Sequence, residues 1–342
     1  MKILKQSLFA ILVLSMFGAF TIDAMAQEKR RAAVQAYNKA SELAKNDQLE
    51  EAITQFEEAI KVGQAAESAG EEGADIVEKS KAKIPGIYYQ SAINDYKASQ
   101  TTGSISSLEK AIASFEQVVD AGNQYGDTQL ADKSAGIITQ LNYKKSVLQF
   151  RAQNYDASLA TINQVIADNE NYANGYYQKA LIMKKKGSLD DMLNMLEKTI
   201  EVGEKANNTK IVRKAKEKAA SELIYAGSKK IQSKNYTSAI EQLNQALEYD
   251  AESSDAHYRL AEAYNDRGDF GQGLTHSRKA LELEKGGRSA KAKIYFEIAT
   301  AHKGNGNFSQ ACDAFSNAAY GSFKSSAEHQ MEYALKCSSK TK

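Results

Sequence analysis

Seven short patterns of small and apolar residues recur along the chain. In each, a small residue is followed four positions later by a bulkier residue, and three positions after that by another small or apolar residue. Positions i, i+4 and i+7 share one face of an α-helix, so each pattern predicts a helix that buries this face. The seven patterns, of which the third and fourth are weaker, are Ala52/Phe56/Ala59, Ala111/Phe115/Val118, Ser158/Ile162/Val165, Met192/Leu196/Thr199, Ala239/Leu243/Ala246, Gly273/Ser277/Ala280 and Ala311/Phe315/Ala318.

The distances between successive patterns predict how long the intervening helices are. The first residues of the patterns are separated by 59, 47, 34, 47, 34 and 38 residues. A step of 34 residues accommodates one antiparallel helix pair. The extra residues of each 47-residue step are helix formers, as in segments 131–140 and 210–220. We therefore predict two lengthened helical hairpins, over 122–142 and 203–223, which project beyond their neighbours by about 10 Å.

The 59-residue step is interpreted as containing a loop. Residues 98–106, ASQTTGSIS, lack apolar periodicity and are rich in polar and small residues. Proline is favoured in the first turn of a helix, so Pro85 is expected to begin the helix that carries Tyr88 and Tyr89.

The first 26 residues have the pattern of a secretory signal peptide. Lys2 and Lys5 precede an apolar run over 8–20, and residues 24–26 read Ala-Met-Ala. The run is short for a membrane span, although an uncleaved N-terminal anchor is the alternative. We expect export, cleavage after Ala26 and a soluble mature chain, 27–342, in the periplasm of the cell envelope, where the outer membrane is a candidate neighbour.

The segment that begins at Asp255 resembles the tetratricopeptide repeat. It carries Leu-Ala at 260–261, Tyr264, Gly268 and Phe270, followed by Gly273 and Ala280. The resemblance implies an all-α fold, an α-solenoid in which helical hairpins form a right-handed superhelix. About seven repeats would fill 27–342, with a final capping helix over 325–338, where Ser-Ser-Ala-Glu at 325–328 fits a capping box.

Composition and charge point away from several function classes. Lysine plus arginine total 44 and aspartate plus glutamate 43, giving a net charge of +1 and no strong field for nucleic acid. The sequence has no phosphate-binding loop, nucleophile elbow or His-Glu-x-x-His spacing, so we expect no catalytic residues, cofactor or metal. His302 and His257 replace packing aromatics of the repeat, whereas His276 and His329 are isolated.

The resemblance places partner contacts on the first helix of each repeat. Aromatic residues recur there at one register, with Ile224 as the exception beside Tyr225, and with Tyr88 or Tyr89 in the second unit. Tyrosine suits protein recognition, but an aromatic here also packs between repeats, and both interpretations stay open. The candidate groove residues are Tyr37, Tyr143, Tyr177, Tyr225, Tyr258 and Phe296.

Cys312 and Cys337 are the two cysteines of the chain. The predicted antiparallel helices that carry them place both near the same height, and export would favour oxidation. We therefore predict a disulfide, with two buried thiols as the alternative.

Three functions are compatible with these features. The leading hypothesis is a non-enzymatic envelope adaptor that binds a peptide or helix of another protein in its concave groove. The alternative is a structural component of a secretion or surface-assembly complex, held by its convex face and long hairpins. A carbohydrate-modifying enzyme is a third class, but the sequence shows no clustered acid pair for it.

Overall fold

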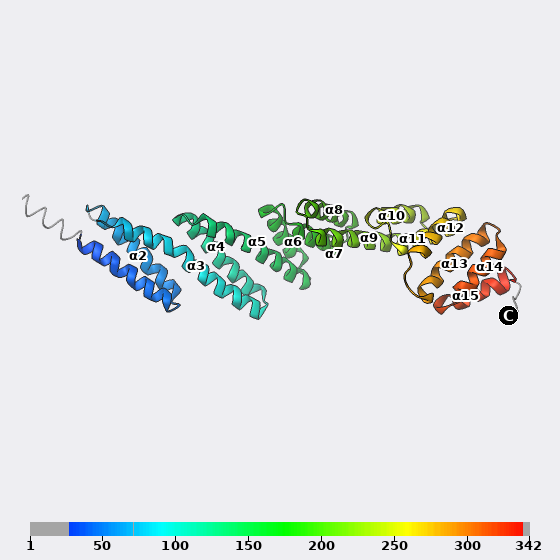
Figure 1. Ribbon diagram of the computed structural model, residues 1–342, viewed down its shortest axis with the longest axis horizontal. Helices are drawn as coiled ribbons and strands as arrows, with labels where there is room; N and C mark the ends of the chain where they lie inside the picture. Colours follow the sequence, from blue (N-terminus) through cyan, green and yellow to red (C-terminus); the bar gives the residue numbers. More distant parts are fainter. Residues whose placement is uncertain (1–26, 71, 338–342) are drawn as a thin grey trace, which may run out of the picture. The chain divides into compact units, whose positions relative to one another are not determined.

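The computed structural model describes residues 27–70 and 72–337, so the predicted signal peptide, 1–26, lies outside the described residues. Within these ranges the chain is almost entirely helical and contains no strand. Contacts group the chain into two compact units, which meet between Glu170 and Asn171 in the sequence. The all-α prediction is confirmed (Figure 1).

The first unit consists of three helical hairpins. Residues 27–45 are helical and precede α2, and short turns connect each helix to the next. The remaining helices are α2 (Leu49–Glu67), α3 (Ala74–Thr102), α4 (Ile105–Tyr125), α5 (Thr128–Arg151) and α6 (Tyr155–Asp168).

The second unit contains four more hairpins and a terminal helical segment. The first two are formed by α7 (Ala173–Lys186), α8 (Leu189–Lys205), α9 (Thr209–Gln232) and α10 (Tyr236–Tyr249). The next two are formed by α11 (Ser254–Arg267), α12 (Phe270–Leu283), α13 (Arg288–Gly304) and α14 (Phe308–Ala318). The chain then forms a 3₁₀ turn, η1 (Gly321–Phe323), followed by α15 (Lys324–His329) and the π-helical turn η2 (Gln330–Ala334).

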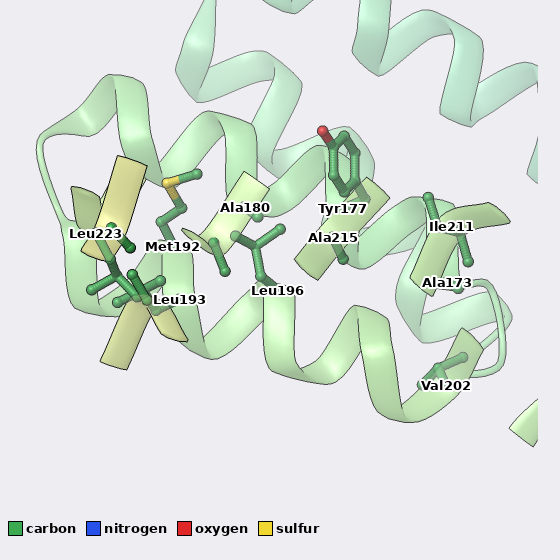
Figure 2. Close-up of a cluster of buried hydrophobic side chains, with 13 residues drawn as sticks. Ala173, Tyr177, Ala180, Met192, Leu193, Leu196, Val202, Ile211, Ala215 and Leu223 are labelled. Carbon is green, nitrogen blue, oxygen red and sulfur yellow. The ribbon is translucent and has the colours of Figure 1, made fainter. Parts of the chain in front are cut away.

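The seven predicted patterns all lie on second helices of these hairpins, and their first residues are buried. The bulky residue of each pattern fills the space between helices; Phe56, Phe115 and Phe315 are among the largest fully buried side chains. Figure 2 shows one such cluster, where Met192 and Leu196 of α8 pack with residues of α7 and α9. Small residues allow the helices to approach, and bulky ones fill the remaining gap.

Three pairs of consecutive helices, each of which links one of these hairpins to the next, are lengthened, rather than the two predicted, and they are called the long hairpins below. The predicted helical stretches 122–142 and 203–223 are confirmed, since α5 and α9 each have 24 residues against 14 in α7. The third is formed by α2 and α3, of which α3 has 29 residues.

A glycine allows close helix approach in each long hairpin. Gly63, Gly122 and Gly203 each lie eleven positions after the first residue of the pattern on their helix, Ala52, Ala111 and Met192. A Cβ on Gly63 would lie 2.7 Å from the Val77 side chain, and one on Gly122 would lie 2.7 Å from the backbone oxygen of Asp127. A side chain at these positions would therefore push the two long helices apart.

Two predictions about the 59-residue step are wrong. Residues 98–106 are not a loop, because α3 continues to Thr102 and the break consists of Gly103, in the left-handed region, and Ser104. Pro85 does not begin a helix but lies inside α3, buried between Ile84 and Ile87, which are also buried. Burial of these residues outweighs the cost of the missing backbone N–H, about 3 kcal/mol for an interior proline.

The predicted capping box of the terminal helix is also wrong. The helix begins at Lys324, directly after η1, and Phe323 precedes it without a side-chain cap. Ser325 is therefore already inside the first turn, where it cannot act as the N-cap. The helical residues end at Ala334 rather than at 338, and a coil leads to Cys337.

Candidate interaction surfaces

The predicted groove aromatics of the first unit pack against second helices. The Tyr37 ring meets the buried Phe56 ring edge-on, with centroids 5.4 Å apart. In the second hairpin Tyr89 contacts Phe115 in the same way, at 6.0 Å. Tyr143 is half-buried, and this burial raises the pKa of its hydroxyl. These positions contribute to packing inside the unit.

Two tyrosines of the second unit are almost fully enclosed. Tyr177 is 7% exposed, and the amine of Lys214 lies 4.4 Å above its ring. Tyr258 is 5% exposed, with the amine of Lys293 4.5 Å from its ring. Each lysine lies on the first helix of the following hairpin and covers the ring face that a ligand would contact.

Phe296 also packs inside the second unit. Its ring lies 5.3 Å from that of Phe315 and 5.4 Å from that of Phe323. The structure therefore assigns packing contacts to Phe296, as to Tyr37, Tyr177 and Tyr258. Ligand binding by these residues stays a prediction without structural support.

Tyr225 differs from the other five candidates because its ring is 62% exposed. It lies on α9 in one row with Lys218, Glu222 and Lys229, which are spaced four, three and four positions apart and so share a helix face. The amine of Lys229 is 5.6 Å from the Tyr225 ring. Glu222 is buried and binds Lys184 of α7 as well as Lys218, the latter at 2.8 Å.

These five residues, Tyr225, Lys184, Lys218, Glu222 and Lys229, are called the Tyr225 surface below. Burial opposes ionisation of Glu222, but hydrogen bonds from the two lysines outweigh it and lower the pKa of this carboxyl. Glu222 is thus a fixed anion that orders two cations beside an exposed aromatic ring. The surface keeps a net positive charge, which complements an acidic ligand.

In the sequence, Tyr225 is the neighbour of the exceptional Ile224, and nothing at that position alone separates it from the packed tyrosines. One position along a helix rotates a side chain by about 100°. This rotation turns the Tyr225 side chain away from the helix face on which the packed aromatic residues lie. The signal that could have found it is the run of lysines at the spacing of one helix face around it.

A buried polar network joins α11 and α13. The side-chain amide of Asn265 donates to the backbone oxygen of Glu297 at 3.0 Å and to its carboxylate at 2.8 Å. Burial raises the pKa of Glu297 to about 7. Both residues are enclosed, so the network is a structural element rather than an accessible acid.

His276 is not isolated, contrary to the sequence prediction. Its Nδ1 lies 3.0 Å from Nδ1 of the buried His257, and Tyr264 stacks on its ring. Burial lowers the pKa of His276 to about 4, so the pair is neutral near pH 7 and one Nδ1 proton can serve both rings. His302 is buried, as expected for a packing position.

Two further features were sought in the described ranges, a cluster of metal ligands and a membrane-spanning helix. Within residues 27–70 and 72–337, no three His, Cys, Asp or Glu side chains converge as metal ligands. In the same part of the chain, no helix combines the length and hydropathy needed to cross a membrane.

Comparisons with known proteins address the fold. A protein-family model described as the TPR repeat matches residues 227–268, and a second family model, described as the tetratricopeptide repeat, matches residues 36–62. The first match covers the end of α9 and all of α10 and α11; the second covers much of the first hairpin. No curated protein sequence matches the chain.

Several solved structures are similar to parts of this chain at low sequence identity. The crystal structure of MamA protein is 17% identical and covers 58% of this chain and 96% of its own, with a TM-score of 0.36. YrrB, described as a TPR protein with an unusual peptide-binding site, is 13% identical and covers 56% and 91%, with a TM-score of 0.36. MamA 41-end from Desulfovibrio magneticus RS-1 is 15% identical and covers 53% and 92%, with a TM-score of 0.35. The two matches lie on helices of three of the seven similar helical hairpins and show that this chain contains tetratricopeptide repeats.

Proposed function

We propose that this protein is an exported, non-enzymatic adaptor of the cell envelope that binds an extended peptide or a helix of another protein. Tetratricopeptide-repeat proteins are generally interaction scaffolds rather than catalysts. The pattern of residues 1–26 supports export. The observation that carries the binding role is the exposure of Tyr225 among ordered lysines.

The Tyr225 surface combines the two features that a peptide-binding site needs. The tyrosine offers a stiff apolar area with a polar tip, which costs little conformational entropy on binding. Lys184 and Lys218 are held in place by Glu222, so their positions are fixed before a ligand arrives. We propose that the bound segment carries an acidic residue next to an apolar one.

Site-specific photocrosslinking tests this role in cells. A photoreactive residue replaces Tyr225 on α9, and a matched one replaces the exposed Glu241 on the second helix α10. We expect one discrete protein partner at position 225 and none at 241, identified by mass spectrometry. Crosslinks at 241 alone would contradict binding through the first helices. N-terminal sequencing of the protein from the periplasmic fraction tests export, with Gln27 as the expected first residue.

The second candidate function is a structural role in an envelope complex. It is favoured by hollows beside two of the long hairpins. In the second unit a hollow of about 540 Å³ lies beside α8 and α9 and is lined by Val212, Arg213 and Tyr249. In the first unit a hollow of about 500 Å³ lies beside α4 and α5 and is lined by Val119 and Ile138. A stable stoichiometric complex in a pull-down would support this role, whereas a transient set of peptides supports the adaptor.

A further inference from the structure

The second helix of every hairpin carries a large apolar or aromatic residue three positions before the first residue of its pattern. In six hairpins this residue is buried or half-buried by its surroundings, whereas in the last one, Phe308 of α14, it is 57% exposed. The seven residues in chain order are Leu49, Leu108, Tyr155, Leu189, Tyr236, Phe270 and Phe308. The chain thus places an apolar side chain at its last hairpin without the cover that the others have.

The preceding hairpin shows what such a cover is. The ring of Phe270 on α12 packs against Gly304, the last residue of α13, so closely that a Cβ there would lie 2.4 Å from the ring. The cover is therefore the end of the following helix, which carries a small residue at the contact. After α14 the following helix, α15 with η2, is helical only over 324–334, compared with 17 residues in α13. It is too short to cover Phe308 in the same way.

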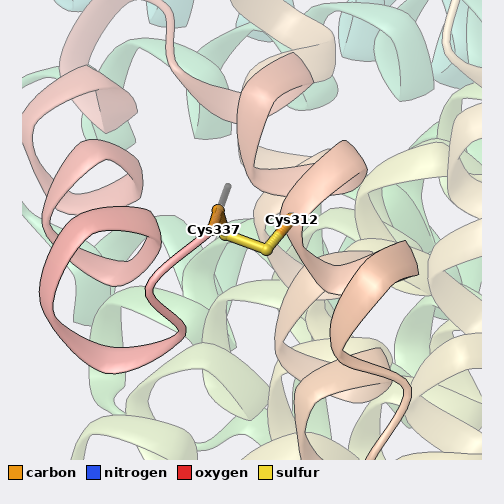
Figure 3. Close-up of a disulfide and its surroundings, with 2 residues drawn as sticks. All are labelled: Cys312 and Cys337. Carbon is orange, nitrogen blue, oxygen red and sulfur yellow. A yellow bond between two sulfur atoms is a disulfide. The ribbon is translucent and has the colours of Figure 1, made fainter. Parts of the chain in front are cut away.

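The uncovered position opens into a groove of about 800 Å³ between α14 and the terminal helix. Phe308, Met331 and Leu335 give the groove an apolar floor, and Glu328 and Glu332 add carboxylates from the terminal helix. Asp313 and Lys336 also line it. The Cys312–Cys337 disulfide joins α14 to the coil after the terminal helix, so it holds both walls of the groove (Figure 3).

We propose that this groove binds a helical segment of another protein, which carries a small residue over Phe308 and lysine or arginine beside Glu328 and Glu332. The Phe270–Gly304 contact provides the steric argument, because it shows which element fits this position in the same unit. The carboxylates provide the charge argument for a basic partner. The groove shares no residue with the Tyr225 surface, so this proposal and the proposed function can fail separately.

A pair of synthetic peptides tests the proposal on the oxidised chain 27–342. One is a stapled helix with a stripe of glycine and alanine flanked by lysines, and the other has glutamates in place of the lysines. By fluorescence anisotropy we expect the lysine peptide to bind, and the glutamate peptide to bind at least about tenfold more weakly. Phe308→Ser and the double variant Glu328→Gln/Glu332→Gln should each weaken binding of the lysine peptide at least about tenfold.

Controls separate this outcome from misfolding and from other occupants. Glu241→Gln on α10 should bind as the wild type does, and Phe308→Leu should retain most of the affinity. Because Phe308 is exposed, its serine variant should keep the wild-type melting temperature. Equal binding by wild type and Phe308→Ser would overturn the proposal. The proposal would also be overturned if a chain ending at Cys337 bound the lysine peptide at least about tenfold more tightly than 27–342 does, because residues 338–342 would then be the occupant of the groove. If light scattering showed that the wild type is a dimer and Phe308→Ser a monomer, the occupant would be a second copy of this chain, and the proposal would again be overturned.

Discussion

The amide oxygen of Asn265 occupies the space that a side chain at position 273 would need. A Cβ built on Gly273 would lie 1.9 Å from this oxygen. The amide nitrogen of Asn265 is bound to the backbone and the carboxylate of Glu297, so the group cannot turn away without losing both hydrogen bonds. One side chain thus couples α11, α12 and α13.

This coupling predicts that the effect of Gly273→Ala depends on Asn265. In the wild type the added methyl group should lower the free energy of unfolding by about 1–3 kcal/mol through overpacking. In an Asn265→Ala background the same change should be neutral or stabilising, because alanine favours a helix over glycine. Urea unfolding of the four proteins measures the coupling. An equal cost in both backgrounds would show that the two residues do not interact.

The long hairpins predict opposite effects for two glycines of one hairpin. Gly122→Ala would bring a Cβ within 2.7 Å of the Asp127 backbone oxygen and 3.0 Å of the Ala131 Cβ, and should destabilise the first unit by about 1–3 kcal/mol. Gly136→Ala on α5 meets nothing within 4 Å and should stabilise the unit by about 0.5–1 kcal/mol. Thermal unfolding compares them. If both variants melted alike, the close approach at Gly122 would be unsupported.

Glu297 predicts a dependence of stability on pH. Burial raises its pKa from 4.5 to about 7, so the folded protein holds a proton that the unfolded chain has already released. This carboxyl therefore contributes stability that is fully present below pH 4.5 and is lost as pH rises through about 7. Glu297→Gln should remove that contribution to the pH dependence. The free energies of unfolding of both proteins between pH 4.5 and 8 give the test, and parallel curves would contradict it.

The sequence predicts well those helices in which close packing limits the size of the residues at the crossing points. Ala52, Ala111 and Ala239 lie at helix crossings, where little more than a methyl group fits, so the constraint is visible in the residues themselves. The third long hairpin was missed because Pro85 and the polar segment 98–106 were interpreted from local propensity. Gly63, at the same offset as Gly122 and Gly203, is the signal that marks it.

The candidate site was harder to predict, because exposure depends on residues distant in sequence. Tyr177 and Tyr225 both belong to the predicted groove set. Tyr177 is enclosed partly because Lys214, from another helix, lies over its ring. No local pattern around Tyr177 reveals this neighbour. The exposure of Phe308 likewise depends on where the terminal helix ends, which was predicted at 338 but lies at Ala334.

The two cysteines predict an oxidised and locally stabilised C-terminus. The structure joins Cys312 and Cys337, with Cα atoms 5.8 Å apart. A loop of this size contributes about 3–4 kcal/mol in the chain-entropy model. We expect no reactive thiol in denatured, unreduced protein from the periplasm, and faster hydrogen exchange over 324–334 in Cys337→Ser. Two titratable thiols per chain would exclude the bridge in that compartment.

Tyr177 on α7 is buried and Tyr225 on α9 is exposed, so substitutions at the two positions distinguish a packing role from a binding role. Tyr177→Ala removes an enclosed ring and should destabilise the second unit by about 3–5 kcal/mol, the range for a large aromatic. Tyr225→Ser removes an exposed ring and should leave the melting temperature unchanged. This difference makes Tyr225→Ser a clean variant for a binding experiment.

The affinity of the partner segment captured at position 225 tests the adaptor function most directly. Isothermal titration calorimetry compares its binding to the wild type and to Tyr225→Ser, with Glu241→Gln as the control. If the protein is an adaptor that binds through Tyr225, Tyr225→Ser should weaken binding at least about tenfold, or about 1.4 kcal/mol, while Glu241→Gln should bind as the wild type does. Equal affinity of the wild type and a correctly folded Tyr225→Ser variant for this segment would show that Tyr225 does not bind the partner.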